Sequence, residues 1–364
     1  FNNFLVDTYA LDADARGWLE FPRELPGLLV VLMAAILCML TVTQMGIVGA
    51  LTFAAGLLGL ALWGPANYWL MVFLMMVGSA GMHLLQPVTS SIALSLGDPS
   101  KRGWRMGQLG VVGVVGSVLG AGIVWLLFLR DTPRYGLWFA VAAGTAAISA
   151  VLYFRLHIPH LHQPRARLVI RKRFWLYYLL EFLFGARKQI FLTFGFWVLI
   201  KEYGQHAGGF AGLIMIASIV GLGFKPLVGL AIDRFGERSI MIADGLMLAV
   251  VCIGYGFAKR LTGDAHTAHR IASACFIADN LLFALGTSRS VYVARLTESP
   301  QELTSTLAVG VSINHIASMV LPGLGGLLWM AFGYERVFVV AALLAVSISA
   351  VSTLVPKHGA AATA

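Results

Sequence analysis

Long apolar runs, separated by short segments rich in Gly, Pro and charge, make up most of the chain. Their apolar positions follow one another continuously instead of alternating, which excludes transmembrane β-strands. Each run is close to, or longer than, the roughly 20 residues that an α-helix needs to cross a bilayer. The runs cover residues 16–40, 45–63, 68–96, 105–129, 137–156, 174–200, 210–232, 239–258, 270–296, 303–330 and 334–355. The pattern therefore predicts an all-α integral membrane protein with about eleven full transmembrane helices.

A shorter apolar segment, Phe1–Val6, precedes these runs. We expect it to be the tail of a further helix, truncated upstream; the alternative is a protein with eleven crossings. This tail is counted below as helix 1, so that run 16–40 is helix 2.

The longest connection, residues 157–173, is polar and basic. It divides the chain into an N-terminal bundle at 1–156, from the helix 1 tail to helix 6, and a C-terminal bundle at 174–364, helices 7 to 12. Two six-helix bundles joined by a linker are the layout of a duplicated transporter.

Composition narrows the class further. The chain is 59% hydrophobic and 12% charged, against about 45–50% and 25% in soluble domains. A soluble enzyme, a nucleic-acid binder and a secreted disulfide domain are therefore excluded. Cys38, Cys252 and Cys275 lie within apolar runs, and three histidines lie in the linker at 157–162. We expect no metal site and no cofactor. Because no phosphate-binding loop and no catalytic constellation is visible, neither ATP-driven transport nor an enzyme is expected.

The net charge of +9 reflects topology. Thirteen Lys and Arg residues lie in one set of connections and eight in the opposite set. The richer set includes residues 157–173 and Lys357. By the positive-inside rule, the linker and the C-terminus are expected to be cytoplasmic. We expect a multi-pass protein of a bacterial inner membrane, without a nucleic-acid partner.

Polar residues inside the predicted helices point to a central path. An intramembrane charge is costly, so it normally faces the protein interior or a water-filled cavity. Helices 4, 7 and 10 carry most of these residues, whereas helices 3, 6 and 12 lack ionisable residues in their cores. Helices 4, 7 and 10 are therefore expected to line the path, and helices 3, 6, 9 and 12 to face lipid. Lys225 lies in helix 8.

A loop motif then suggests a family. Residues 229–238 read GLAIDRFGER between helices 8 and 9, which is similar to the cytoplasmic signature G-x-x-x-D-R-x-G-x-R/K of the major facilitator superfamily. The resemblance implies alternating access and a conformational latch that favours the outward-facing state. The latch residues would be Gly229, Asp233, Arg234, Gly236 and Arg238, with Gly236 permitting a tight turn. A plain basic loop is the alternative.

One loop departs from the family pattern, and one helix shows a further similarity to it. The equivalent first-half loop, residues 40–46, lacks the Asp-Arg signature. Helix 5 carries glycines that resemble the glycine-rich motif of the family's antiporters, although tight packing against a neighbouring helix is the favoured interpretation. These glycines are Gly110, Gly113, Gly116, Gly120 and Gly122.

Candidate site residues follow from the intramembrane polar groups. For substrate binding or gating we expect Arg187, Lys188, Gln189, His83, Gln86, Asn280, Asn314 and His315. For proton coupling we expect Asp279, with Glu181 as the rival. Alternatives stay open: an internal ion pair for Arg187, a salt bridge from Asp279 to Arg187 or Lys188, and structural hydrogen bonds for the histidines.

A charged group near the start of helix 2 has two interpretations. Glu20, Arg23 and Glu24 are expected to form a solvated cluster at the outer mouth; an outer gate is the alternative.

The sequence thus predicts a secondary active transporter of a small solute, working by alternating access and coupled to protons. The basic cavity helices favour an organic anion or a zwitterionic metabolite. Its partners would be a small-molecule substrate, protons and the lipid bilayer, and it would be a monomer. A proton-antiport efflux pump for drugs or metabolites, and a non-transporting receptor or scaffold with the same fold, are the alternatives.

Overall fold

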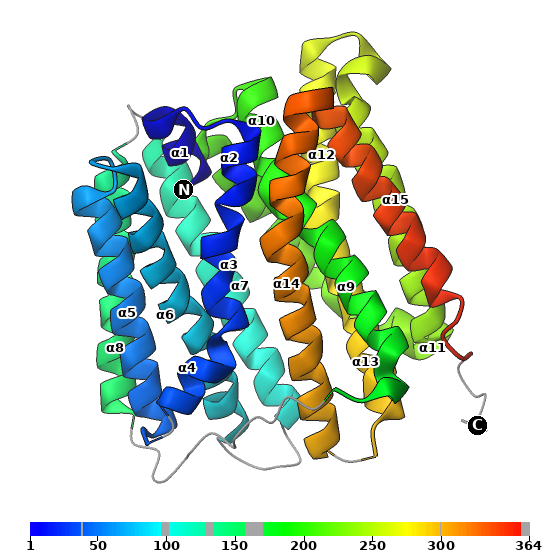
Figure 1. The fold of residues 1–364 in the computed structure, drawn as a ribbon, viewed down its shortest axis with the longest axis horizontal. Coiled ribbons are helices and arrows are strands. Elements are labelled where there is room, and N and C mark those ends of the chain that lie inside the picture. The colour runs from blue at the N-terminus through cyan, green and yellow to red at the C-terminus, as the bar shows by residue number, and fades with distance from the viewer. Residues whose placement is uncertain (38, 96–101, 129–133, 157–169, 299, 358–364) are drawn as a thin grey trace.

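The computed structural model describes residues 1–37, 39–95, 102–128, 134–156, 170–298 and 300–357. Regular structure in these ranges is entirely helical (Figure 1). Most helices from the first part of the chain lie on the left of Figure 1 and most from the second part on the right. Most of residues 157–173, the predicted linker, lies outside the described ranges, so the division into two bundles stays a prediction.

The first part of the chain contains eight helices in the described ranges. They are α1 (Asn2–Tyr9), α2 (Ala13–Trp18), α3 (Glu20–Leu28), α4 (Val30–Ile36), α5 (Val42–Trp63), α6 (Tyr68–Ser95), α7 (Arg102–Phe128) and α8 (Tyr135–Arg155). The predicted run 16–40 is divided into α2, α3 and α4. Pro22 lacks the backbone N–H that would bond to the Trp18 carbonyl, which accounts for a break between α2 and α3, whereas Pro26 lies inside α3.

The loop that lacks the Asp-Arg signature has a local role instead. Thr41 and Gln44 form a capping box at the start of α5. The Thr41 hydroxyl accepts from the Gln44 backbone N–H at 3.3 Å, and the Gln44 side-chain oxygen accepts from the Thr41 N–H at 2.9 Å. This satisfies two backbone donors at the helix start.

The helices of the second part of the chain are more deeply buried on average. They are η2 (Lys172–Phe174), α9 (Trp175–Ile190), the π-helical turn η3 (Phe191–Gly195), α10 (Phe196–Tyr203), α11 (Ala207–Thr262), α12 (Ala265–Leu282), η4 (Phe283–Gly286), α13 (Thr287–Leu296), α14 (Pro300–Phe332) and α15 (Tyr334–Ser352). Predicted helix 7 corresponds to α9, η3 and α10, and predicted helix 10 to α12, η4 and α13.

Helix α11 contains two predicted helices that meet at Gly236. The backbone there has φ 78° and ψ 154°, a conformation essentially confined to glycine. The predicted glycine turn between helices 8 and 9 is therefore confirmed.

Nine helices in the described residues are long and apolar enough to cross a membrane. The prediction was eleven. One of the nine, Ala207–Thr262, holds two of the predicted crossings, and the divided run 16–40 is not counted as one helix. All eleven predicted runs are thus represented by helical segments.

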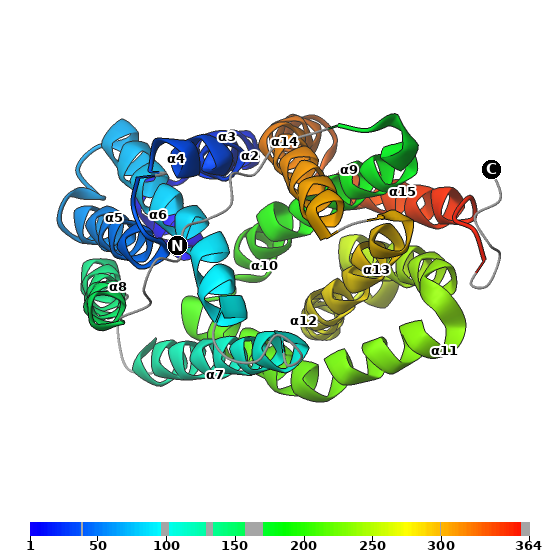
Figure 2. The same cartoon turned by 90° about the horizontal axis from the view of Figure 1, so that it is seen from below.

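Helix α7 differs from the expectation for its glycines. A Cβ placed at any of Gly110, Gly113, Gly116, Gly120 or Gly122 would meet no described atom within 4 Å. The interpretation that these glycines pack tightly against a neighbour is therefore wrong for the described structure. Helix α7 lies beside α11 (Figure 2). Because glycine has no side chain, these positions leave hollows between the two helices.

Candidate functional site

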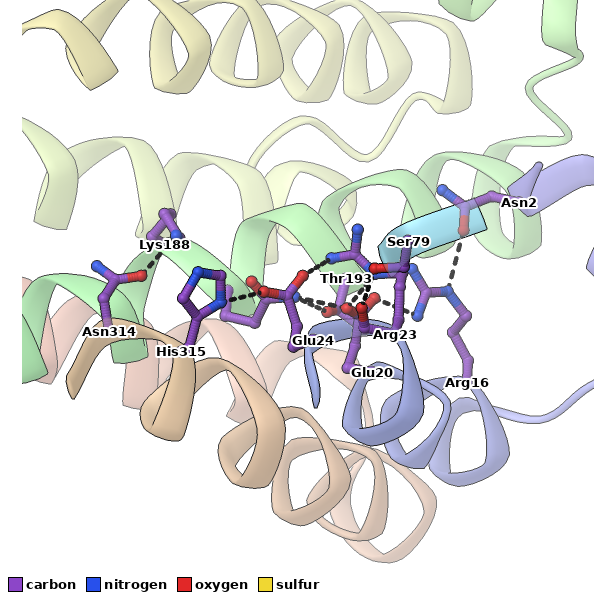
Figure 3. Close-up of polar contacts among 11 residues, drawn as sticks. Asn2, Arg16, Glu20, Arg23, Glu24, Ser79, Lys188, Thr193, Asn314 and His315 are labelled. Carbon is purple, nitrogen blue, oxygen red and sulfur yellow. Dashed lines mark hydrogen bonds and ion pairs between the residues drawn. The ribbon is translucent and has the colours of Figure 1, made fainter. Parts of the chain in front are cut away.

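Four charged residues of α2 and α3 form a buried network (Figure 3). Glu20 is fully buried and accepts from Arg16 at 2.6 Å and from Arg23 at 2.5 Å. Arg23 also pairs with Glu24 at 2.6 Å. We call Arg16, Glu20, Arg23 and Glu24 the central charge network. The expectation of a solvated rim cluster is wrong, because α14 and residues of α9 cover these carboxylates.

This network binds the two parts of the chain together. Gln189 of α9 donates to Glu20 at 2.8 Å. His315 of α14 lies with its Nδ1 2.9 Å from an oxygen of Glu24. Two of the predicted binding residues, Gln189 and His315, therefore join the first part of the chain to the second.

Helices α2 and α14 meet backbone to backbone next to the network. A Cβ added at Gly17 would overlap the Pro322 carbonyl, and one at Gly326 would overlap the backbone of Ala13. Trp18 covers Gly323 in the same way. This contact lies toward the end of α14 that is opposite its start (Figure 1).

Arg187 is paired inside the second part of the chain. Its guanidinium, from α9, donates to Asp279 of α12, and both residues are almost fully buried. Two further guanidinium nitrogens, Nε and Nη2, have no hydrogen-bond partner in the described structure, and neither does Oδ1 of buried Asp244. The internal ion pair that stood as the alternative for Arg187 and for Asp279 is the geometry observed.

Other predicted site residues also form hydrogen bonds or ion pairs within the protein. Arg289 donates to Glu181 at 2.9 Å and lies 3.4 Å above the Phe184 ring. Lys188 donates to Asn314 at 2.6 Å. In α6, Gln86 is exposed.

Two hollows open between α7 and α11. One, of about 430 Å³, is lined by Lys225, Ser117, Ser218 and Asn280 among mostly small residues. The other, of about 370 Å³, shares Ser117 and Ile214 with it. Of the predicted site residues, only Asn280 lines either hollow. Its side-chain NH₂ donates to the Phe276 carbonyl.

Lys225 brings a cation to the first hollow. Its side chain is exposed, and the described structure shows no ion pair for it. It was visible in the sequence as an intramembrane charge but was not chosen as a site residue. The two serines carry no sequence signal that separates them from other helix serines.

The charged residues of the predicted latch loop lie in different surroundings. Asp233 and Arg234 are exposed, and Arg234 lies over the neighbouring Phe235 ring at 5.4 Å. The ion pair that bridges to another helix here joins Glu237 to Arg295 of α13.

One group of side chains has the composition of a metal site. Ligand atoms of Glu24, His83 and His315 all lie within 4.8 Å of one another. These residues come from α3, α6 and α14.

Comparison with known proteins agrees with this architecture. The sequence matches the profile described as Major Facilitator Superfamily over residues 24–288. A search of the curated proteins finds no match.

Solved structures resemble the whole chain. The nucleoside transporter NupG is 14% identical, with a TM-score of 0.76 over 98% of this chain and 93% of its own. A D-xylose-proton symporter is 15% identical, with a TM-score of 0.72 over 98% and 92%. A bacterial homologue of the human lysosomal transporter Spinster, titled inward-facing and unoccupied, is 15% identical, with a TM-score of 0.65 over 96% and 91%.

These likenesses show the fold, and the profile covers well over half of the residues. Together they indicate a multi-pass membrane transporter with a small-molecule substrate, and not an enzyme. The chain belongs to the Major Facilitator Superfamily.

Proposed function

We propose that the chain moves a small organic anion or zwitterion across the membrane by alternating access, coupled to protons. The observation that carries this proposal is the hollow containing Lys225. It lies between α7 and the pair α11 and α12, which come from different parts of the chain. A site between the two repeats is where transporters of this kind place their substrate.

The chemistry of the hollow favours a negatively charged group. Lys225 supplies a cation that is not neutralised by a carboxylate in the described structure, while Ser117, Ser218 and Asn280 add hydrogen-bonding groups. The deeper cations Arg187 and Arg289 are paired with carboxylates. Lys225 is therefore the cation that supports the anion proposal in this conformation, and Arg187 and Lys188 belong to the protein's internal contacts.

The conformation fits an inward-facing state. The start of α14 lies on the predicted cytoplasmic side, because Glu302 there pairs with Arg171 of the predicted linker. The α2–α14 contact closes the opposite end of the molecule. The exposed Asp233 and Arg234 of the predicted latch agree with this, since a formed latch would favour the outward-facing state.

Proton coupling is proposed at the Arg187–Asp279 pair. The Arg187 guanidinium pairs with Asp279 and lies within electrostatic reach of a second buried carboxylate, Asp244, so a proton taken up by either carboxylate would neutralise the one negative charge that Arg187 does not balance. Asn280, next to Asp279 in sequence, lines the hollow, so occupancy there can influence the pair. Glu181, paired with Arg289, is the rival.

Ligand-induced thermal stabilisation tests the substrate class. The purified chain in lipid nanodiscs would be screened against organic anions, zwitterions, neutral nucleosides and sugars, and lipophilic cations. We expect stabilisation by an anion or zwitterion, reduced at least tenfold in apparent affinity by Lys225→Gln. Lys357→Gln, the same change at an exposed lysine outside the predicted helix cores, is the matched control.

Each alternative function predicts stabilisation by a different class of ligand. Stabilisation only by lipophilic cations would favour the efflux alternative, and stabilisation only by neutral nucleosides or sugars would contradict the anion proposal. Equal effects of the two lysine variants would remove Lys225 from the site.

A further inference from the structure

We propose that Glu24, His83 and His315 form a binding site for a divalent transition-metal ion, such as Zn²⁺, that bridges the two parts of the chain. Two imidazoles and one carboxylate are a ligand set that such ions favour over Mg²⁺ or Ca²⁺. Glu24 and His83 belong to the first part of the chain, and His315 to the second. The proposal does not depend on the substrate or on proton coupling.

The three side chains converge on one point of α3. The two imidazole rings lie 5.0 Å apart, edge to face. A side chain at Gly27, one turn after Glu24, would collide with both rings. The ligand atoms lie within 4.8 Å of one another, and around a bound zinc they would be about 3.3 Å apart, given bonds of about 2.0–2.1 Å. Metal binding would draw the three side chains together by that difference.

One buried atom without a hydrogen-bond partner favours metal binding over a purely structural contact among Glu24, His83 and His315. Nε2 of His83 is buried and has no hydrogen-bond partner in the described structure. A buried polar atom without a partner is costly, and a metal ion would satisfy it. The Glu24 carboxylate is held in place, because one of its oxygens faces Arg23 and the other faces His315 (Figure 3). The oxygen beside His315 is the one available to a metal ion.

Nearby cations lower the expected affinity of this site for a metal ion. Arg23 contacts Glu24 directly, and the Lys188 ammonium donates to Asn314, the neighbour of His315. Both charges oppose a divalent ion, so the affinity should be weaker than that of a closed structural zinc site. The site is thus suited to an ion that binds reversibly and holds the two parts of the chain in the arrangement seen here.

Metal titration of the tag-free, chelator-treated full chain in nanodiscs tests the proposal. Calorimetry with Zn²⁺ should give one equivalent per chain. His83→Ala and His315→Ala should each weaken binding by at least tenfold. His206→Ala, at an exposed histidine with no side-chain cap bond at the start of α11, should not. A triple alanine change at His157, His160 and His162 should also leave the site intact.

A spectrum of the wild-type chain keeps the test independent of variant folding. Bound Cu²⁺ should show paramagnetic resonance couplings to two imidazole nitrogens. Absence of saturable binding, a spectrum without nitrogen couplings, or loss of the site in the linker variant instead of the His83 and His315 variants would overturn the proposal.

Discussion

At the scale of single residues, buried charge is the main feature of this protein. The Arg187 guanidinium is almost fully enclosed and donates to one carboxylate, Asp279. Removing one partner of a buried pair leaves an uncompensated charge, whereas removing both is often close to neutral. The pair should therefore behave as a unit in mutational studies.

A double-mutant cycle tests this. Asp279→Asn should lower the free energy of unfolding in mixed micelles by about 3–5 kcal/mol. Adding Arg187→Met should recover much of that loss, because no unpaired guanidinium remains. A double variant whose loss equals the sum of the two single losses would contradict the pairing.

Gly236 provides a second residue-scale prediction. Its backbone conformation, φ 78° and ψ 154°, disfavours every other residue, so Gly236→Ala should lower the free energy of unfolding by about 1–3 kcal/mol. Gly223→Ala is the matched control, since Gly223 lies in the helical part of α11 with open space around it. Equal losses in the two variants would show that the turn does not need glycine.

At the scale of elements, the contact between α2 and α14 joins the first part of the chain to the second. Glycines bring the two backbones together there, and a larger residue has no room. Backbones can approach closely where small residues line a helix interface. The sequence alone does not reveal this contact, because Gly323 and Gly326 lie about 300 residues after the helix that they meet.

Gly326→Val should therefore separate the two helices. Spin labels at the exposed positions 12 and 331 should move apart in this variant, as measured by electron–electron resonance. Gly223→Val, which meets nothing within 4 Å, should leave the distance unchanged. An unchanged distance in Gly326→Val would contradict the closed contact.

Ion pairs at the start of α14 hold the last residues of the predicted linker. Glu302 pairs with Arg171 and Arg173 and accepts from the Glu298 backbone N–H at 2.9 Å. That backbone bond, followed by the two arginines, lowers the pKa of Glu302. Its contribution to stability is therefore complete above the ordinary carboxyl pKa and is lost as the pH falls through the lowered value.

Comparing wild type with Glu302→Gln across pH tests this linkage. The wild type should be more stable at neutral pH, and the difference should shrink as the pH falls below about 4. A difference that does not change with pH would mean that the Glu302 charge has no part in it.

At the scale of the whole molecule, the helices were predictable and their contacts were not. Hydropathy located the crossings, since each depends on local composition. Lys225 and Asp279 were visible as intramembrane charges. By contrast, Glu20 was placed at a solvated rim, because its burial depends on Gln189 and the cover of α14, far away in sequence.

The anion-transport proposal is tested most directly by proton flux. Proteoliposomes containing the chain would be given an organic anion that stabilises it, with internal pH recorded by a trapped dye. We predict anion-evoked proton movement that Lys225→Gln reduces at least tenfold and that Asp279→Asn uncouples from anion uptake. Lys357→Gln should transport as wild type does. Anion uptake without proton movement would refute the coupling. The absence of uptake by protein that binds the anion would contradict transport itself.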